Sequence, residues 1–375
     1  MRMNKKFRIV LCVIIATGTI VWWYNRPYPP KETLTSRQEA NVKEMLKEMR
    51  TRCVGRYLID LPASFTPYRS SQQLEDNHWV ANVSMPDDSR KTYITTKRMY
   101  SPAFEQFIQR REKEIAQGIV INPLNKPYLK KVWVLSNGMK GVIFERNVDS
   151  GTNDAMRTLE GYLYTNGVAI KLQKVSVNNS SPRYEKDRDG DPIRNFIPRD
   201  IDRMNSLLFR ITGRQEGEIP TTPGSCIADA FIAADKYAQG QEDIYRNYTS
   251  DVAWGLKVSL NMDNFTKGRD SVLERAGDIS RDLSRMHGYI VRKGSFDING
   301  LHAEEILMMA PEPSNNESRY SFGLYINEKI ASYKLPGLTL DLGNISRNPT
   351  PYTQEEIITF WDAITHTVRL RPNAF

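Results

Sequence analysis

Side chains that could perform chemistry are few in this chain of 375 residues, and their spacing matches no common catalytic motif. The sequence has no Gly-x-Ser-x-Gly pentapeptide, which would present a nucleophilic serine on a tight turn, and no glycine-rich phosphate loop. Zinc sites commonly use a close pair such as His-Glu-x-x-His, whereas the histidines here are scattered. The sequence therefore predicts no catalytic, cofactor-binding or metal-binding residue. The histidines are His78, His287, His302 and His366.

Two acidic patterns come closest to a functional site. The run from Asp187 to Asp191 begins like a calcium loop, but Pro192 occupies the glycine position and Pro198 the position of the bidentate glutamate. Glu304-Glu305 and Glu355-Glu356 are adjacent pairs, and neighbouring residues on a strand or helix point in different directions. These pairs do not form an acid–base couple. Distant carboxylates could still meet in a glycosidase, so the missing motifs lower the expectation of an enzyme without excluding one.

The composition excludes several classes of protein, and the charge excludes another. With 40% hydrophobic and 10% aromatic residues, the chain is neither disordered nor collagen-like. Its formal net charge is +8, but residues 1–31 contain six cations and no acid, so the remainder carries only +2. A nucleic-acid-binding protein normally carries its excess on a folded face or a dense basic run. We therefore expect no nucleic-acid partner.

Residues 1–31 are predicted to form a signal anchor and stem. A basic segment is followed by an uncharged run over 9–24 and then by a proline-rich stretch. The run ends in Trp22, Trp23 and Tyr24, which favour a membrane interface, rather than in the small residues of a cleavage site. An uncleaved anchor is the better interpretation, and a cleaved signal is the alternative. The positive-inside bias then places the rest of the chain in the periplasm, tethered to the inner membrane.

Cys53 and Cys226 are the two cysteines beyond the predicted anchor, which contains Cys12. Both lie in β-like, apolar segments suited to burial, which argues against a reactive thiol. Because the predicted compartment is oxidising, Cys53 and Cys226 are a candidate disulfide. The alternative is that both are small buried hydrophobic side chains.

After an amphipathic helix over 36–51, the chain repeats one pattern of elements twice. Each copy opens with a short strand at a cysteine, Cys53–Pro62 and Cys226–Ile232. A second β segment, a charged helix, an Asn-Gly hairpin, a strand pair and a closing helix with a short basic end follow in both copies. Chance agreement of turn signals is the alternative to a true repeat. The expected ranges are 79–85, 102–117, 132–146, 159–177 and 199–211 in the first copy, and 254–260, 269–287, 294–308, 320–342 and 353–369 in the second.

This repeat predicts an α+β fold of two tandem, similar domains, each an antiparallel sheet with packed helices. We expect the first domain over 32–213, a linker over 214–225 and the second domain over 226–375. A Cys53–Cys226 bridge would then join the starts of the two domains.

Two polar loops are too long for tight turns, residues 178–195 and 311–319. We expect both to be exposed. They are candidates for partner recognition or, equally, variable surface insertions.

The opening segment Cys53–Pro62 resembles the start of bacterial immunity proteins that neutralise phospholipase effectors of type VI secretion. Pro223–Ile227, Leu335–Leu338 and the closing helix at Phe360–Ile364 are similar to that family's second domain. The resemblance implies a stoichiometric inhibitor that grips a lipase of the α/β-hydrolase type in the periplasm. It identifies no partner-binding residue, because the matching motifs are structural.

On the residues alone, two alternatives stay open. One is an anchored cell-envelope enzyme of the glycan hydrolase type, which would require a cleft with paired carboxylates. The other is an envelope adaptor that binds peptidoglycan or a secretion component. A lipase partner would distinguish the immunity protein from both.

Overall fold

The computed structural model describes residues 28–68, 74, 79–188, 190–235, 240–253, 255–344 and 350–375. The expected anchor therefore lies outside the described residues, apart from its last four positions. Among the helices of the described segments, none is both long enough and apolar enough to span a bilayer.

The first half of the chain begins with helix α2 and then alternates strand pairs with helices. Thr35 caps α2 by accepting a hydrogen bond from the Gln38 backbone. The elements are α2 (Ser36–Met45), β1 (Met49–Val54), β2 (Tyr57–Pro62), β3 (Thr66–Pro67), β4 (Ala81–Met85), β5 (Asp88–Arg98), α3 (Ser101–Ala116), a 3-10 turn (Pro123–Asn125), β6 (Leu129–Val134), β7 (Gly141–Asn147), β8 (Met156–Thr165), β9 (Val168–Val177), a second 3-10 turn (Pro182–Tyr184), α4 (Glu185–Arg188), α5 (Ile197–Arg210) and β10 (Ile211–Gly213).

The second half repeats this order of strand pairs and major helices. Its elements are β11 (Gly224–Ile227), β12 (Ala230–Ala233), β13 (Gln241–Thr249), β14 (Leu256–Asp263), α6 (Ala276–Arg285), β15 (Tyr289–Ile298), β16 (Leu301–Pro311), β17 (Ser318–Ile326), β18 (Gly337–Asn344), α7 (Gln354–Thr365) and β19 (Arg369–Leu370). The predicted α+β architecture of two similar halves, each with an antiparallel sheet and packed helices, is confirmed.

The large sheets of the two halves join edge to edge. Strand order in the joined sheet is β15-β16-β17-β18-β14-β13-β4-β5-β9-β8-β7-β6, with β3 added beside β13. If each strand is replaced by its counterpart in the other half, this order reads the same from either end. The counterparts β4 and β13 pair antiparallel at the centre, with Ser84 opposite Gln241 and Ala81 opposite Ile244. We call this β4–β13 pairing the seam.

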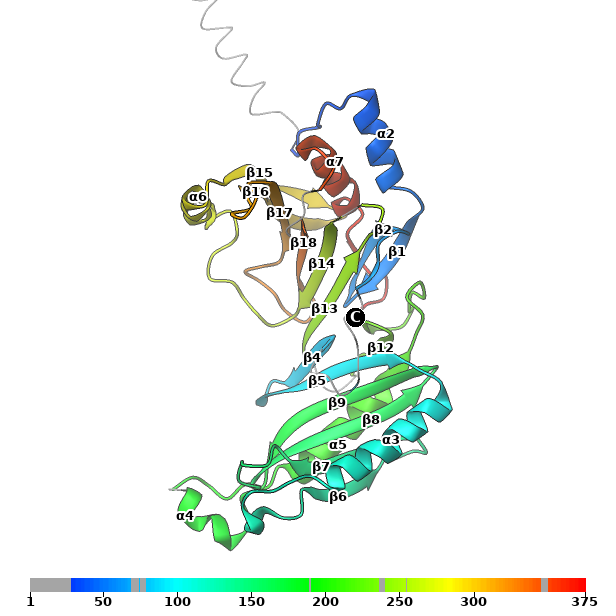
Figure 1. Cartoon of the computed structure of the whole chain (residues 1–375), viewed down its shortest axis with the longest axis vertical. Coiled ribbons are helices and arrows are strands. Elements are labelled where there is room, and N and C mark those ends of the chain that lie inside the picture. The colour runs from blue at the N-terminus through cyan, green and yellow to red at the C-terminus, as the bar shows by residue number, and fades with distance from the viewer. Residues whose placement is uncertain are drawn as a thin grey trace, which may run out of the picture.

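The two halves also exchange their closing strands. β10 ends the first half but pairs with β12, and β19 ends the second half but pairs with β2. Gly55 and Cys226 connect the two opening hairpins through a pair of backbone hydrogen bonds, each 2.8 Å long. The opening hairpin β1–β2 consequently lies beside α2 and α7 in the lobe of the second half (Figure 1). Neither half is a separate globule.

Helices cover both faces of the joined sheet, and alternate residues of each strand point to opposite faces. α5 and α7 pack on one face, where Met204 and Trp361 enter the main core. α3 packs on the other face in the first half, with Phe107 against Tyr162, and α6 does so in the second half, with Ala276 near Ile306. We call the side that carries α3 and α6 the outer face.

Five expected elements differ from the structure, one of them the segment Cys226–Ile232, which forms the hairpin of β11 and β12 and not one strand. The helix expected over 36–51 ends at Met45, because residues from Met49 onward pair with β2. The segment Cys53–Pro62 is not one strand: Gly55, with a φ of +56°, turns the chain back between β1 and β2. The helix expected over 269–287 begins only at Ala276. The expected repeat makes 254–260 the counterpart of 79–85. In the structure, 81–85 forms β4, whose counterpart is β13, and 256–263 forms β14.

Candidate functional site

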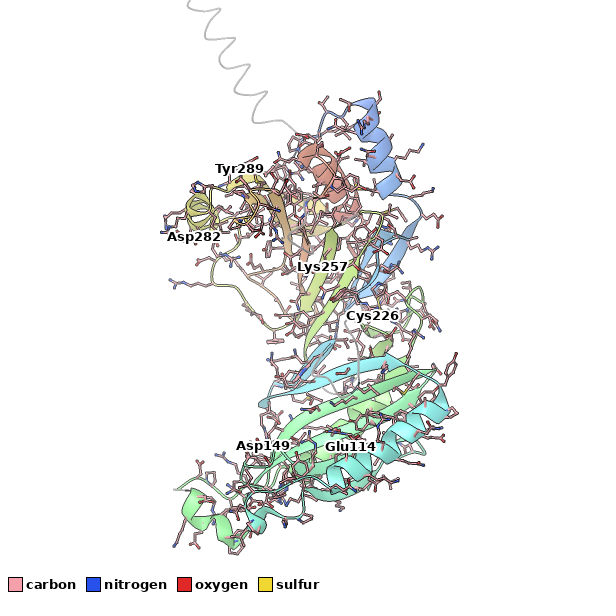
Figure 2. The ribbon with its side chains drawn as sticks, in the orientation of Figure 1. Glu114, Asp149, Cys226, Lys257, Asp282 and Tyr289 are labelled. Carbon is pink, nitrogen blue, oxygen red and sulfur yellow. A yellow bond between two sulfur atoms is a disulfide. The ribbon has the colours of Figure 1, made fainter. Side chains whose placement is uncertain are left out.

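The candidate disulfide lies at the contact between the two opening hairpins. The structure joins Cys53 to Cys226, with their Cα atoms 5.7 Å apart, although 173 positions separate them in sequence. Both side chains are buried, beside Leu58 and Phe231. Figure 2 labels Cys226, which lies where the two lobes of the molecule meet. This position connects the two halves and suits a structural role.

On the outer face of the second half, much of the sheet is left uncovered. α6 packs over β15, β16 and β17, where Ile290, Ile306 and Tyr325 meet it. Strands β13, β14 and β18 extend beyond this cover, and their outward side chains are mostly polar. We call this surface the open face. It comprises Tyr245, Asn247, Lys257, Ser259, Asn261, Thr339 and Asp341.

Where the open face meets the seam, Asp243 connects the two halves. This nearly buried carboxylate accepts hydrogen bonds from Asn82 Nδ2 of the first half at 3.0 Å and from Asn261 Nδ2 at 2.8 Å. The Tyr245 hydroxyl also donates to it, at 2.8 Å. Partial burial and this hydrogen bond raise the pKa of Tyr245 to about 12, so the phenol stays a donor at neutral pH.

A groove runs between α6 and the open face, and we call it the α6 groove. Its walls include Ile279, Leu283, Met286, Met308 and Arg319, and Asp341 lies on its floor. Met286, the C-cap of α6, is 56% exposed, and Asp282 of the same helix, labelled in Figure 2, also lines the groove. The surrounding protein desolvates the Asp341 carboxylate and raises its pKa to about 6, against the effect of Lys257, although the side chain still reaches solvent.

On the outer face of the first half, α3 covers β7, β8 and the start of β9. Phe104 and Phe107 are buried against the sheet, and Arg111 donates to both oxygens of Glu160, at 2.7 and 3.1 Å. Arg146 donates to the same carboxylate at 2.8 Å. Burial alone would raise the pKa of Glu160, but the hydrogen bonds and charges of the two arginines hold it at about 2. This fully charged cluster fixes α3 to the sheet.

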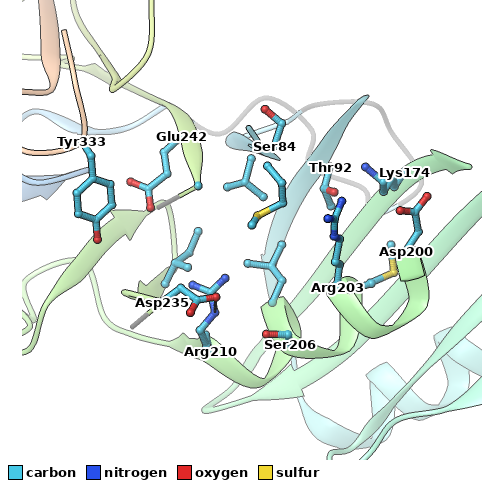
Figure 3. Close-up of a pocket in the computed structure, with 16 residues that line it drawn as sticks. Ser84, Thr92, Lys174, Asp200, Arg203, Ser206, Arg210, Asp235, Glu242 and Tyr333 are labelled. Carbon is cyan, nitrogen blue, oxygen red and sulfur yellow. Dashed lines mark ion pairs between the residues drawn. The ribbon is translucent and has the colours of Figure 1, made fainter. Parts of the chain in front are cut away.

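On the opposite face a cavity lies at the seam, and we call it the seam cleft (Figure 3). Its apolar walls include Met85, Met204 and Ile232. Its charged groups have partners of opposite charge within the protein, such as Lys174 with Asp88 at 3.2 Å and Glu242 with Arg56 at 3.3 Å. Lys174 and Asp200 lie together at one end, and Glu242 and Tyr333 at the other. This internal neutralisation suits a structural joint.

Comparison with known protein families decides what kind of protein this is. The family described as Tle cognate immunity protein 4 matches with its N-terminal domain over residues 50–214 and with its C-terminal domain over residues 218–373. The chain belongs to this family. It is therefore a type VI secretion immunity protein that binds a cognate Tle phospholipase effector, and it is not an enzyme. The predicted family and function are confirmed, and the envelope-enzyme alternative is wrong.

Solved structures of immunity proteins share the fold. The apo structure of immunity protein TplEi of the type VI system from Pseudomonas aeruginosa has a TM-score of 0.66 and 20% identity, covering 87% of this chain and 98% of that chain. The crystal structure of the Tle4–Tli4 complex gives 0.66 and 20%, covering 86% and 98%. TplEi with an "L" peptide gives 0.61 and 20%, covering 87% and 99%. A search of curated proteins finds no match. Members of this family act in the periplasm.

The two loops expected to be exposed lie in different parts of the immunity protein. The loop over 178–195 carries the second 3-10 turn and α4 at the end of the first half far from α6, and its Tyr184 is buried (Figure 1). The loop over 311–319 ends at the α6 groove, where Arg319 lines the wall and pairs with Glu312. Only the second loop borders the open face.

Sequence analysis missed the open face, although a signal for it was present. Residues 256–263 alternate strictly between apolar and polar side chains, as do 338–341. Such alternation indicates a strand with one face in the core and one face toward water. What the pattern could not show is that α6 would leave these particular strands uncovered.

Proposed function

We propose that the open face and the α6 groove form the main contact surface for the effector, and that binding there covers the entrance of its active site or holds its lid closed. The observation that carries this proposal is the difference in cover between two otherwise similar halves. In the first half, α3 covers Phe144, Tyr162 and Ala169 on the outer face, and the outward residues Thr95 and Lys171 are also buried, whereas the outward residues of β14 and β18 in the second half reach solvent. Holding a lid or covering the entrance would stop the lipase from opening onto lipid.

The composition of this surface supports the proposal. Tyr245 is 46% exposed and Met286 is 56% exposed, and tyrosine and methionine are enriched in protein interfaces. The joined sheet and the Asp243 hydrogen bonds hold the two halves in one arrangement. A preorganised surface loses little entropy on binding, which favours the tight complex that protection requires.

The test uses the double variant Tyr245→Ala/Met286→Ala and the lipase encoded by the neighbouring gene. Loss of two exposed anchors should weaken binding by at least about tenfold, roughly 1.4 kcal/mol, as measured by titration calorimetry. The matched control is Glu112→Ala/Lys113→Ala on the solvent side of α3, which should bind as the wild type does. Equal affinity of the two double variants would contradict the proposed surface.

The finer organisation of the chain is also a proposal. We retain 32–213 and 226–375 as the two repeat units, with 214–225 between them, because the main strand pairs and helices that follow each opening hairpin have the same order, although the boundary at 226 falls within β11. We further propose that residues 1–31 tether the protein to the inner membrane and that Cys53 and Cys226 are bridged in the periplasm. Cell fractionation of the full chain tests the tether: release by osmotic shock without membranes would contradict it.

A further inference from the structure

The stem that follows the proposed anchor is attached to the body at its first described residue. Tyr28 lies against the edge strand β15, and its hydroxyl donates to Glu305 Oε1 at 2.6 Å. Its ring centroid is 5.7 Å from that of Phe296, and the Arg292 guanidinium lies 6.0 Å from the Tyr28 ring centroid. A free tether would make none of these contacts.

The carboxylate that accepts from the Tyr28 hydroxyl is held in place by further hydrogen bonds. Glu305 is fully buried on β16 and also accepts hydrogen bonds from Arg292 Nε at 2.8 Å and Trp361 Nε1 at 2.9 Å. The three donors come from the stem, from β15 and from α7. A buried carboxylate needs such donors to remain charged. Burial and the charge of Glu305 raise the pKa of Tyr28 well above its ordinary value, so the phenol keeps its proton.

The edge strand also provides space for the ring. A Cβ atom at Gly294 would lie 2.4 Å from Cζ of Tyr28, which is closer than atoms can approach. Gly294 is therefore required for the space it leaves beside the ring. Gly294, Glu305 and Phe296 together form a binding site for one tyrosine side chain, and we call it the Tyr28 receptor.

Beyond Tyr28 the chain stays on the same end of the second half. Leu34 packs on the main core, and the capped start of α2 follows directly. Gln38 Nε2 then donates to Thr353 Oγ1 at 3.0 Å, and Asn41 Nδ2 donates to Glu356 Oε1 at 2.7 Å. The stem and α2 are thus held along α7.

We propose that Tyr28 docks the stem on the second half and so holds the α7 end of the protein against the inner-membrane surface. This inference rests on the proposed anchor. From Tyr24, the last residue of the uncharged run, to Tyr28 the chain reaches at most about 14 Å. A docked Tyr28 therefore keeps the second half close to the lipid, while the first half extends to the far end of the molecule (Figure 1). The partner of this end is a lipid surface.

Limited trypsin cleavage after Lys31, on the full chain in nanodiscs of phosphatidylethanolamine and phosphatidylglycerol, tests the docking. Lys31 lies between the docked Tyr28 and the packed Leu34, so we expect slow cleavage in the wild type and cleavage at least about tenfold faster in Tyr28→Ala. Gly294→Val, which fills the receptor from the other side, should give the same release. Tyr100→Ala removes a tyrosine that is 85% exposed and should leave the stem unchanged. Should Gly294→Val fail to fold, Tyr28→Ala still tests the contact, because Tyr28 is not part of the joined sheet.

A second readout measures how far each half of the protein lies from the lipid surface. A dye at Asp297, on the β15–β16 hairpin, should be quenched by a lipid-bound acceptor in the wild type and less in Tyr28→Ala. A dye at Asp149 in the first half should be quenched weakly in both (Figure 2). Membrane-bound wild-type protein that is cleaved after Lys31 as fast as Tyr28→Ala overturns the docking and leaves the anchor intact. A full chain that does not associate with membranes overturns both, whereas normal effector binding by Tyr28→Ala keeps the proposed binding surface separate.

Discussion

The two halves of this immunity protein share one strand order and differ in what covers it. In the first half, the 16-residue helix α3 lies over the outer face and is fixed by Phe107 and by Arg111 on Glu160. In the second half, the 10-residue helix α6 covers only the strands near the sheet edge. The difference teaches that a repeated topology does not imply a repeated surface. One copy serves as a closed scaffold, and the other leaves a face free for a partner.

The buried carboxylates of the two halves show the same divergence. Glu160 faces the outer side and binds the arginines that hold α3. Glu305 faces the opposite side, where it accepts from Trp361 of α7 and from the stem. Each half thus uses a charged cluster to hold a different helix. Among the described ion pairs of Glu305, none holds the outer helix α6.

The largest effect on the free energy of unfolding is expected from breaking the charged cluster that holds α3. Glu160→Ala leaves Arg111 and Arg146 without the buried carboxylate on which both converge, and should cost about 3–5 kcal/mol in the free energy of unfolding. Urea unfolding measures this loss. Glu114→Ala, which removes an exposed partner of the same helix, should change the stability by less than about 0.5 kcal/mol. A similar small loss for both variants would show that the cluster does not fix α3.

Separating the two opening hairpins tests how far the halves depend on each other. Cys53→Ala/Cys226→Ala removes a cross-link between positions 173 apart and should cost about 2–5 kcal/mol. Denaturant unfolding measures the loss. Alkylation with mass spectrometry supplies the control, since peptides of Cys53 and Cys226 should react only after reduction. Free thiols in the exported protein would contradict the bridge.

A matched pair of core truncations compares the two covers directly. Phe107 of α3 and Leu283 of α6 are 6% and 8% exposed, each on the sheet-facing side of the outer helix of its half. Phe107→Ala should cost about 3–5 kcal/mol, and Leu283→Ala about 2 kcal/mol, because the α6 groove lets the second site relax. Thermal unfolding measures both. Leu283→Ala should also weaken effector binding while Phe107→Ala does not. The reverse pattern would place the contact surface on the first half.

The smallest effect concerns the charge on the floor of the α6 groove. The folded protein raises the pKa of Asp341 to about 6, above its value in the unfolded chain, so its contribution to stability is present at low pH and is lost as pH rises through 6. Asp341→Asn should therefore stabilise the protein at pH 7.5, by no more than about 1 kcal/mol because the group reaches solvent. Near pH 4 the gain should vanish. A gain that is as large at pH 4 as at pH 7.5 would contradict this role of the Asp341 charge.

Much of the fold followed from local patterns. The Asn-Gly turns at Asn137 and Asn299 adopt positive φ angles of 58° and 48°, as the hairpin prediction requires. The helices expected over 102–117 and 199–211 agree with α3 and α5 to within two residues at each end. These features depend on neighbours along the chain, so the sequence reveals them.

The candidate site was predictable only in part. Strict alternation over 256–263 indicated a strand exposed on one face, but the same alternation suits a strand covered by a short helix on its polar side. α6 starts at Ala276 rather than near residue 269, and this shortening leaves the strands free. The length of a helix near its ends depends on tertiary packing, which periodicity does not report.

By itself the sequence determined the Asn-Gly hairpins, the helices α3 and α5, the family and the absence of a catalytic motif, because each depends on the spacing of residues close together in the chain. Only the tertiary structure decided that β4 pairs with β13, that β10 and β19 change halves, and that Tyr28 enters a receptor on β15. Strands of similar pattern pair equally well within a half or between halves, so local preference cannot choose among them. The choice depends on how the core packs around contacts such as Tyr28 with Glu305, whose residues are 277 positions apart.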